Sequence, residues 1–239
     1  MATVSPKKKN GLFLPAVVAI LAVGAGVIYW QVQANKPKPI SLAASTPLPT
    51  ATGYLRGNPD APVTIIEFAD FECPGCAQFA TLQEPDIMSR MVDAGLANFR
   101  FYDFPLTNIH ANSLSAHLAA SCANEQGKFW AMHDAIFAAQ IEWSTQATSN
   151  PRKVLDRLAQ EVGLDMAAYG ACFDSQRTLP QIQANAAEGS QRGVNSTPTL
   201  LVGNQMFPGG LTYDGLRKLV DSLIAAKAAA PAPAPAKAP

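Results

Sequence analysis

Two cysteines separated by two residues, Cys73 and Cys76, lie in the segment IIEFADFECPGCAQF, residues 65–79. An apolar run precedes them, and Pro74 stands where the first residue of a helix is often proline. The first turn of a helix offers unpaired N–H groups and the positive end of the helix dipole, and both stabilise a thiolate. The spacing therefore predicts thiol–disulfide exchange, with Cys73 as the exposed nucleophile and Cys76 as the thiol that resolves the mixed disulfide.

Two other uses of this cysteine pair fit its spacing less well. A permanent bridge across two residues closes a very short loop, so it removes little entropy from the unfolded chain. A four-cysteine zinc site would also need Cys122 and Cys172, which do not form a second close pair. We therefore expect neither a metal ion nor a cofactor.

Glu67 is the one charged residue in an apolar run that predicts a buried strand over residues 63–68. A buried carboxyl group has a raised pKa and is costly unless it has a task. Proton exchange with Cys76 would be such a task. On an edge strand, however, Glu67 would be an ordinary surface residue.

Thr197-Pro198 directly precedes another predicted strand, where proline is tolerated. A cis bond between these residues would leave the backbone of Thr197 free to pair with an extended substrate peptide. A trans bond would instead make Pro198 an ordinary turn residue. The segment is therefore a candidate substrate-binding loop.

The charge distribution of the 239-residue chain excludes one class of partner and indicates export. The formal net charge is zero, so no basic field points to nucleic acid. Three lysines lie in residues 1–10, ahead of every acidic residue, and residues 11–30 carry no charge. Residues 12–30 would extend about 28 Å as a helix, close to the ~30 Å core of a bilayer.

This pattern predicts a single-pass membrane anchor through residues 12–30, with residues 1–10 in the cytoplasm and the folded domain on the extracytoplasmic side. The alternative is a signal peptide cleaved near Val32-Gln33-Ala34. Both alternatives export the domain, to the periplasm or the cell exterior. Residues 31–52 are rich in Pro, Ser, Thr and Ala and predict a flexible linker, and residues 225–239 predict a disordered Ala/Pro tail.

Export makes the two remaining cysteines informative, because exported proteins tolerate disulfides. Cys122 and Cys172 both lie in a block that reads as helical. A bridge across a span of this length stabilises by about 4 kcal/mol in the chain-entropy estimate. We expect such a bridge, the alternative being two buried free thiols.

The expected elements follow an order typical of α/β proteins. Pro85 lies inside the first helical stretch and should kink or split it. In chain order the elements are a strand over 63–68, a helical stretch over 74–92, a strand over 96–104, a helical block over 108–178, a helix over 180–192, two strands within 199–207 and a helix over 212–224. Without the helical block the order is β-α-β-α-β-β-α, with a parallel first pair and an antiparallel last pair.

Four segments, in this order, resemble the membrane-tethered kind of DsbA-like thiol–disulfide oxidoreductase: GNPDAPVTIIEFADFECPGC, FRFYDFPL, CANEQGKFWAMHDAIFAAQ and GVNSTPTLLVGNQ. The resemblance covers residues 53–224. It implies a thioredoxin fold with a helical insertion over about 108–178. It also implies that Cys73 is the nucleophile, Cys76 its buried partner, Glu67 the acid beneath them and Thr197-Pro198 a cis-proline substrate loop.

The resemblance further implies an enzyme that introduces disulfides into exported cysteine-containing proteins. A membrane reoxidase of the DsbB or vitamin K epoxide reductase type would then restore the disulfide. Pro74-Gly75 departs from the Pro-Tyr or Pro-His common in the family, and Gly75 has no side chain to cover the sulfur. A less oxidising centre, acting as a reductase or isomerase, is therefore one alternative. A peptide-binding chaperone with an incidental dithiol is another.

Overall fold

The computed structural model describes residues 13–34, 40–41 and 53–229. These residues fall into two units, Met1–Pro37 and Lys38–Pro239. The second unit contains the cysteine pair.

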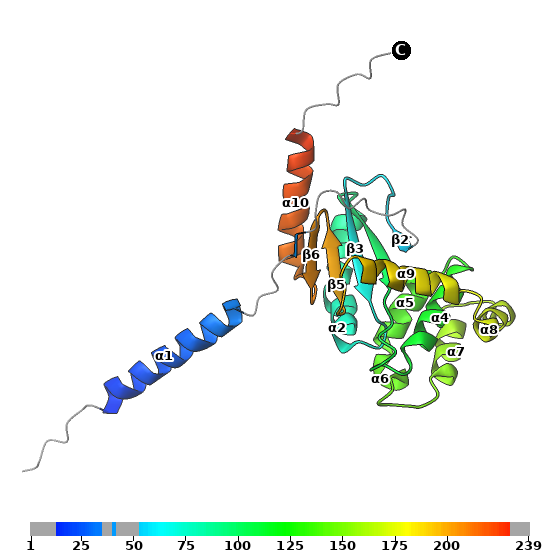
Figure 1. Ribbon diagram of the computed structural model, residues 1–239, viewed down its shortest axis with the longest axis horizontal. Coiled ribbons are helices and arrows are strands. Elements are labelled where there is room, and N and C mark those ends of the chain that lie inside the picture. The colour runs from blue at the N-terminus through cyan, green and yellow to red at the C-terminus, as the bar shows by residue number, and fades with distance from the viewer. Residues whose placement is uncertain (1–12, 35–39, 42–52, 230–239) are drawn as a thin grey trace, which may run out of the picture. The chain divides into compact units, whose positions relative to one another are not determined.

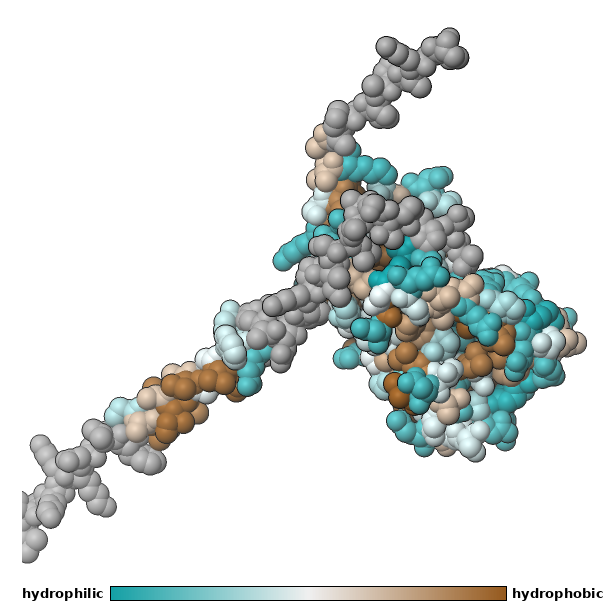
Figure 2. Space-filling model, in the orientation of Figure 1, coloured by the Kyte–Doolittle hydropathy of each residue, from teal (hydrophilic) through white to brown (hydrophobic). Residues whose placement is uncertain are grey.

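The first unit contains the helix α1 (Phe13–Ala34). Figure 2 shows hydrophobic side chains along much of this helix. No helix among the described residues is both long enough and apolar enough to cross a membrane. The anchor expected through residues 12–30 is therefore not supported, and the basic residues 1–10 lie outside the described part of the chain. Residues 31–34 continue α1, where a linker was expected.

A six-stranded sheet forms the centre of the second unit, in the order β1-β6-β5-β3-β4-β2 (Figure 1). Its strands are β1 (Ile40–Ser41), β2 (Tyr54–Arg56), β3 (Val63–Ala69), β4 (Ala97–Asp103), β5 (Thr199–Val202) and β6 (Gln205–Pro208). The pair β3–β4 is parallel and the pair β5–β6 is antiparallel, as the sequence predicts. The pair β3–β5 is also antiparallel. In the interior strand β3, Glu67 lies between Phe101 of β4 and Leu200 of β5.

The helical stretch after β3 divides into α2 (Pro74–Leu82), α3 (Glu84–Ile87) and the π-helix η1 (Met88–Val92). Pro85 occupies the first turn of α3. The break therefore falls where proline removes a hydrogen-bond donor, which confirms the predicted interruption.

The expected helical block is also present, and Figure 1 shows its helices gathered to one side of the sheet. Its members are α4 (Ser113–Asn124), α5 (Phe129–Ala138), α6 (Gln140–Trp143), α7 (Arg152–Glu161) and α8 (Met166–Ser175). The helices α9 (Leu179–Gln191) and α10 (Tyr213–Ala229) complete the unit. Without the block, the order from β3 onward is the expected β-α-β-α-β-β-α.

Apolar clusters cover both faces of the sheet, because successive residues of a strand point to opposite faces. Ile65 packs with residues of α2, α3, η1 and α10, whereas Ile66 packs with the α9 side. A third cluster joins Phe71 and Phe101 to the inward faces of the helical block. The start of α2 is thus held between the sheet and the insertion.

Three segments differ from the prediction. The strand β1 pairs with β6 inside the expected linker, and β2 pairs with β4 although its three residues carry no strand periodicity. The last helix continues to Ala229 instead of ending at Ile224, because alanine and lysine sustain a helix. Residues 230–239 of the expected tail lie outside the described residues.

Candidate active site

Cys73 stands at the junction between β3 and α2. It is the N-cap residue of α2, Pro74 is the first helical residue, and the N–H of Ala77 donates to the Cys73 carbonyl at 3.1 Å. Cys73 is half-buried, whereas the side chain of Cys76, one turn later, is completely buried. Both thiols are free. One sulfur is therefore accessible and the other is sheltered behind it.

The surroundings of Cys73 lower the pKa of its thiol to about 5. The largest cause is a hydrogen bond from the Cys76 thiol, and contact with Thr197 and the backbone N–H groups of Gly75 and Cys76 add to it. Burial opposes these effects. Cys73 is therefore a thiolate at neutral pH, which is the reactive form.

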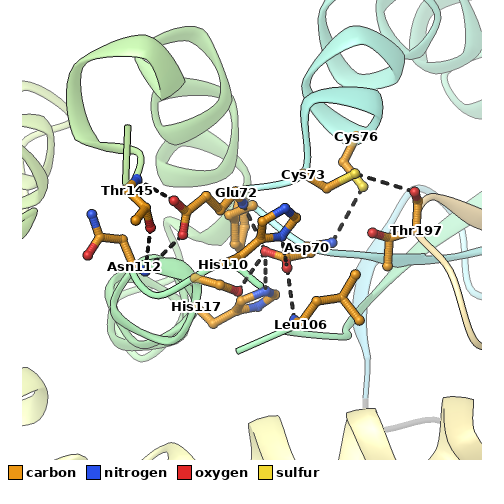
Figure 3. Close-up of polar contacts among 12 residues, drawn as sticks. Asp70, Glu72, Cys73, Cys76, Leu106, His110, Asn112, His117, Thr145 and Thr197 are labelled. Carbon is orange, nitrogen blue, oxygen red and sulfur yellow. Dashed lines mark hydrogen bonds and ion pairs between the residues drawn. The ribbon is translucent and has the colours of Figure 1, made fainter. Parts of the chain in front are cut away.

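The loop before β5 lies beside Cys73, which stays half-buried. The Thr197–Pro198 bond is cis, and the Thr197 carbonyl oxygen lies 3.3 Å from the Cys73 sulfur (Figure 3). A thiol can donate to this carbonyl, but a thiolate cannot. Ionisation of Cys73 therefore leaves the Thr197 carbonyl without this donor.

Gly75 lies where α2 approaches this loop. A Cβ atom on Gly75 would stand 3.3 Å from Cδ of Pro198 and 3.7 Å from the Cys73 sulfur. A side chain here is tightly placed against the ring of Pro198, so glycine leaves open the space beside the nucleophile.

The pKa of the Cys76 thiol is raised well above its usual value, and burial is the main cause. The hydrogen bond to Cys73 and the charge of Glu67 raise it further. Cys76 therefore holds its proton while Cys73 loses one. The two thiols thus differ in both pKa and burial, as a nucleophile and its buried partner are expected to differ.

Glu67 is completely buried, and neither of its side-chain oxygens has a hydrogen-bond donor. Burial raises its pKa well above the usual value, and the neighbouring Glu84 carboxylate raises it further. Burial likewise raises the pKa of Glu84. Burial and the negative charge of Glu84 therefore both favour the protonated form of Glu67.

Asp70 lies in the turn after β3 and is also completely buried, but it is rich in partners (Figure 3). Its carboxylate accepts hydrogen bonds from the N–H of Glu72, the N–H of Leu106 and the hydroxyl of Ser113 at 2.6–2.8 Å. His110 Nδ1 lies 2.8 Å from its second oxygen. The backbone N–H of Asp70 donates to the Cys76 sulfur at 3.5 Å. Asp70 thus fixes the turn on which Cys73 stands.

The insertion holds the same segment from its other side. The Glu72 carboxylate accepts from the N–H of Asn112 at 2.8 Å and from the N–H of Thr145. Gln140 of α6 donates to the carbonyls of Phe71 and Cys73 at 2.7 and 3.0 Å. The residues before α2 are therefore bound to the insertion through both backbone and side chains.

Glu84, His133 and Asp134 are the group in the described residues that could offer three atoms to a metal ion. Asp134, however, lies 2.8 Å from Nδ1 of His133, whereas Glu84 faces Nε2 at 3.9 Å. The two carboxylates therefore stand on opposite ring nitrogens. This arrangement suits a hydrogen-bonded series better than a set of three ligands.

Cys122 of α4 and Cys172 of α8 form a disulfide with their Cα atoms 5.8 Å apart. Both side chains are buried. The bridge joins two helices of the insertion and is separate from the Cys73–Cys76 pair.

The sequence prediction did not include Glu84, Asp70, Glu72 or His133. Asp70 and Glu72 have a local signal, because two acids directly follow an apolar strand and precede the cysteines. Glu84 and His133 have none, since tertiary packing brings them to β3 from other helices.

Comparisons with known proteins agree with this architecture. Residues 49–222 match the family model described as thioredoxin. The chain is 32% identical over 173 residues to a Na(+)/H(+) antiporter NhaA 3 of Salinispora tropica, a match that covers 72% of this chain and 25% of that protein. Because the chain spans only a quarter of that relative, the antiporter's name does not carry over.

Two further similarities cover most of both partners. The chain is 24% identical to Disulfide bond formation protein D of Bacillus subtilis, over 72% of this chain and 78% of that protein. It shares the fold of alpha-DsbA1 of Wolbachia pipientis with a TM-score of 0.66 and 22% identity, over 76% of this chain and 94% of that one. These matches confirm the predicted thioredoxin fold. The chain belongs to the thioredoxin family, whose model it matches over most of its length.

Proposed function

We propose that this chain is an exported dithiol oxidase that donates its Cys73–Cys76 disulfide to cysteine-containing proteins. The observation that carries the proposal is the contrast between an accessible Cys73 with a pKa of about 5 and a buried Cys76 with a raised pKa. A stabilised thiolate favours the reduced form of the enzyme, so the disulfide withdraws electrons from its substrate.

The reaction proceeds by two exchanges. A substrate thiolate attacks the Cys73 sulfur, the bond to Cys76 breaks, and Cys76 leaves with the electron pair and takes a proton from Glu67. The second substrate thiolate then attacks the substrate sulfur of the mixed disulfide, and Cys73 leaves as a thiolate. The substrate loses two electrons and gains a disulfide, and the enzyme dithiol holds those electrons.

We place this reaction outside the cytoplasm. The Cys122–Cys172 bridge suits an oxidising compartment, and residues 1–30 have the charge pattern of an export segment. A membrane reoxidase of the DsbB or vitamin K epoxide reductase type would return the dithiol to the disulfide. Attachment through residues 12–30 stays a sequence prediction without support from the described helices, so export alone is proposed.

The direct test mixes the oxidised full chain with a reduced, unfolded protein that contains cysteines. We expect the substrate to gain disulfides while Cys73 and Cys76 become reduced. Cys76→Ser, with Cys73 first joined to glutathione as a mixed disulfide, should exchange the glutathione for a substrate thiol and accumulate the enzyme–substrate disulfide, because the resolving thiol is absent. Cys73→Ser treated in the same way should form none. Absence of both transfer and trapping would refute the proposal.

A reductase is the second candidate, and Gly75 is the observation that favours it. No side chain between the cysteines covers the thiolate, so the centre lacks one source of oxidising strength. Thioredoxin, with a nucleophile pKa of about 7, has a potential of about −270 mV, and DsbA, at about 3.5, has about −120 mV. We expect a value between them, and equilibration with glutathione measures it.

A further inference from the structure

The proposed reaction raises a question about the source of the Glu67 proton. Each turnover takes one proton from Glu67 to Cys76, and Glu67 must then be protonated again. The Glu67 side chain has no exposed surface, and neither of its oxygens has a donor. Direct exchange with water at the accessible Cys73 surface is therefore closed to it.

Glu84 is a second buried acid that neighbours Glu67. It belongs to α3, is 3% exposed, and shares a hydrogen bond with Glu67 when one carboxyl is protonated. Its Oε1 has no partner and faces Nε2 of His133 at 3.9 Å. That gap is too long for a direct hydrogen bond and suits one bridging water or a small movement.

His133 of α5 connects this buried pair to the surface. Its ring is completely buried, and its Nε2 has no partner. Its Nδ1 lies 2.8 Å from Asp134, whose side chain is 62% exposed. An imidazole with a buried acid at one nitrogen and an exposed carboxylate at the other can take a proton on one side and release it on the other.

A surface pocket of about 420 Å³ lies at this end of the series. Glu84 and Asp134 both line it, together with Arg56 and Asp93. Solvent in the pocket meets the exposed Asp134, whereas Glu84 is only 3% exposed and connects with Asp134 through His133.

We propose that Glu84 and His133 form a proton path that connects Glu67 with solvent at the Asp134 pocket. The inference rests on the proposed dithiol chemistry and deepens it. After Glu67 gives its proton to Cys76, Glu84 gives one to Glu67, and Asp134 and water restore the proton of Glu84 through His133. During reoxidation the same groups carry the proton outward.

Titratable and charged groups face this path from α2, β2 and α5. Cys73 and Cys76 face Glu67 from the start of α2. Arg56 of β2 lowers the pKa of Glu84, as does His133, whereas Asp134 raises it. Glu84 and His133 do not touch the reacting sulfurs, so they are positioning residues that act through Glu67.

The test measures single-turnover reduction of the Cys73–Cys76 disulfide by dithiothreitol in the full chain. Rates are recorded from pH 5 to 9, in H2O and in D2O, for wild type, Glu84→Gln and Asp93→Asn. Asp93→Asn is the matched control, because it removes an acid from the same pocket outside the path. We expect Glu84→Gln to slow the reaction about tenfold at pH 7 and to raise the solvent isotope effect, with the control unchanged.

A chemical rescue separates proton transfer from a structural role. Glu84→Ala should be slow, and added formate should restore its rate by entering through the pocket. Formate should not accelerate wild type or Asp93→Asn. Rescue would support the path, and a slow variant that formate leaves unchanged would refute it.

Two results refute the inference without touching the proposed function. A folded Glu84→Gln variant with the wild-type pH profile and isotope effect would do so while disulfide transfer continued. If neither Glu84→Gln nor His133→Gln folds, the wild-type rate is measured in mixtures of H2O and D2O. A curved dependence on the D2O fraction indicates several protons and supports the path, and a linear one contradicts it. Loss of transfer in wild type itself would refute the proposed function.

Discussion

Two pairs of buried acids flank the cysteine centre, and they have opposite surroundings. Glu67 and Glu84 are 0% and 3% exposed and meet each other without a donor for either Glu67 oxygen. Asp70 and Glu72 are 0% and 5% exposed, but backbone and side-chain donors surround them. The two pairs are therefore equally buried, and they differ in the number of their hydrogen-bond donors. Donors make the second pair an anchor, and their absence makes the first pair a carrier of protons.

The largest effect that separates the pairs is expected for Asp70→Ala. The substitution leaves the N–H of Leu106, the hydroxyl of Ser113 and His110 without their buried acceptor. We expect the free energy of unfolding to fall by about 4 kcal/mol. Urea unfolding at pH 7 measures it. Asp70→Asn should lose less, because an amide oxygen still accepts, and a loss below about 1 kcal/mol for Asp70→Ala would contradict the anchoring role.

Glu67→Gln should change stability in the opposite direction. The pKa of Glu67 is raised in the folded protein. Below the unfolded value of about 4.3 both states hold the proton and the penalty is absent. As pH rises, the unfolded chain loses its proton first, so wild type loses about 1.4 kcal/mol for each unit by which folding raises the pKa.

The measurement for Glu67→Gln compares urea unfolding of the oxidised variant and oxidised wild type at pH 4 and pH 7. The variant's advantage should be small at pH 4 and at least about 1 kcal/mol at pH 7. An advantage that does not grow with pH would show that folding does not raise the pKa of Glu67.

Glu72→Gln tests the Asp70–Glu72 pair and should lower the free energy of unfolding by less than Asp70→Ala does. The amide keeps one oxygen for the N–H groups of Asn112 and Thr145 but loses the charge-assisted bonds. We expect a loss of about 1–2 kcal/mol in urea unfolding. Equal stability of variant and wild type would mean that the insertion does not depend on this contact.

Gly75→His is expected to have the smallest effect and to sharpen the comparison at Cys73. The new side chain adds a donor near the sulfur, although its Cβ lies close to Pro198. We expect the pKa of Cys73 to fall by about half a unit. The pH dependence of iodoacetamide alkylation measures it, with Gly75→Ala as the control for crowding. A raised pKa in Gly75→His alone would contradict the added donor.

The sequence predicts the parts of the site that local patterns encode. A proline after a cysteine at the end of an apolar strand indicates a thiolate at a helix start, and Cys73 stands there. Glu67 interrupts an apolar strand, and it is buried in the interior strand of the sheet. The split at Pro85 has an equally local cause.

What the sequence does not predict depends on contacts between distant segments. Glu84 reads as a polar helix residue beside a proline, and only packing of α3 beneath β3 buries it against Glu67. His133 reads as one histidine among several, because its place between Glu84 and Asp134 needs α5 in position. The strands β1 and β2 form because they pair with β6 and β4. They are too short for their sequences to show the alternating pattern that predicts a strand.

The disulfide between α4 and α8 is a bond of the kind that this protein is proposed to introduce into other proteins. The chain has four cysteines, and Cys122 and Cys172 must lose two electrons after synthesis to form this bridge. The protein thus needs the same oxidation that we propose it performs on others. A mature copy that oxidised this pair in a newly made copy would be acting on its own kind.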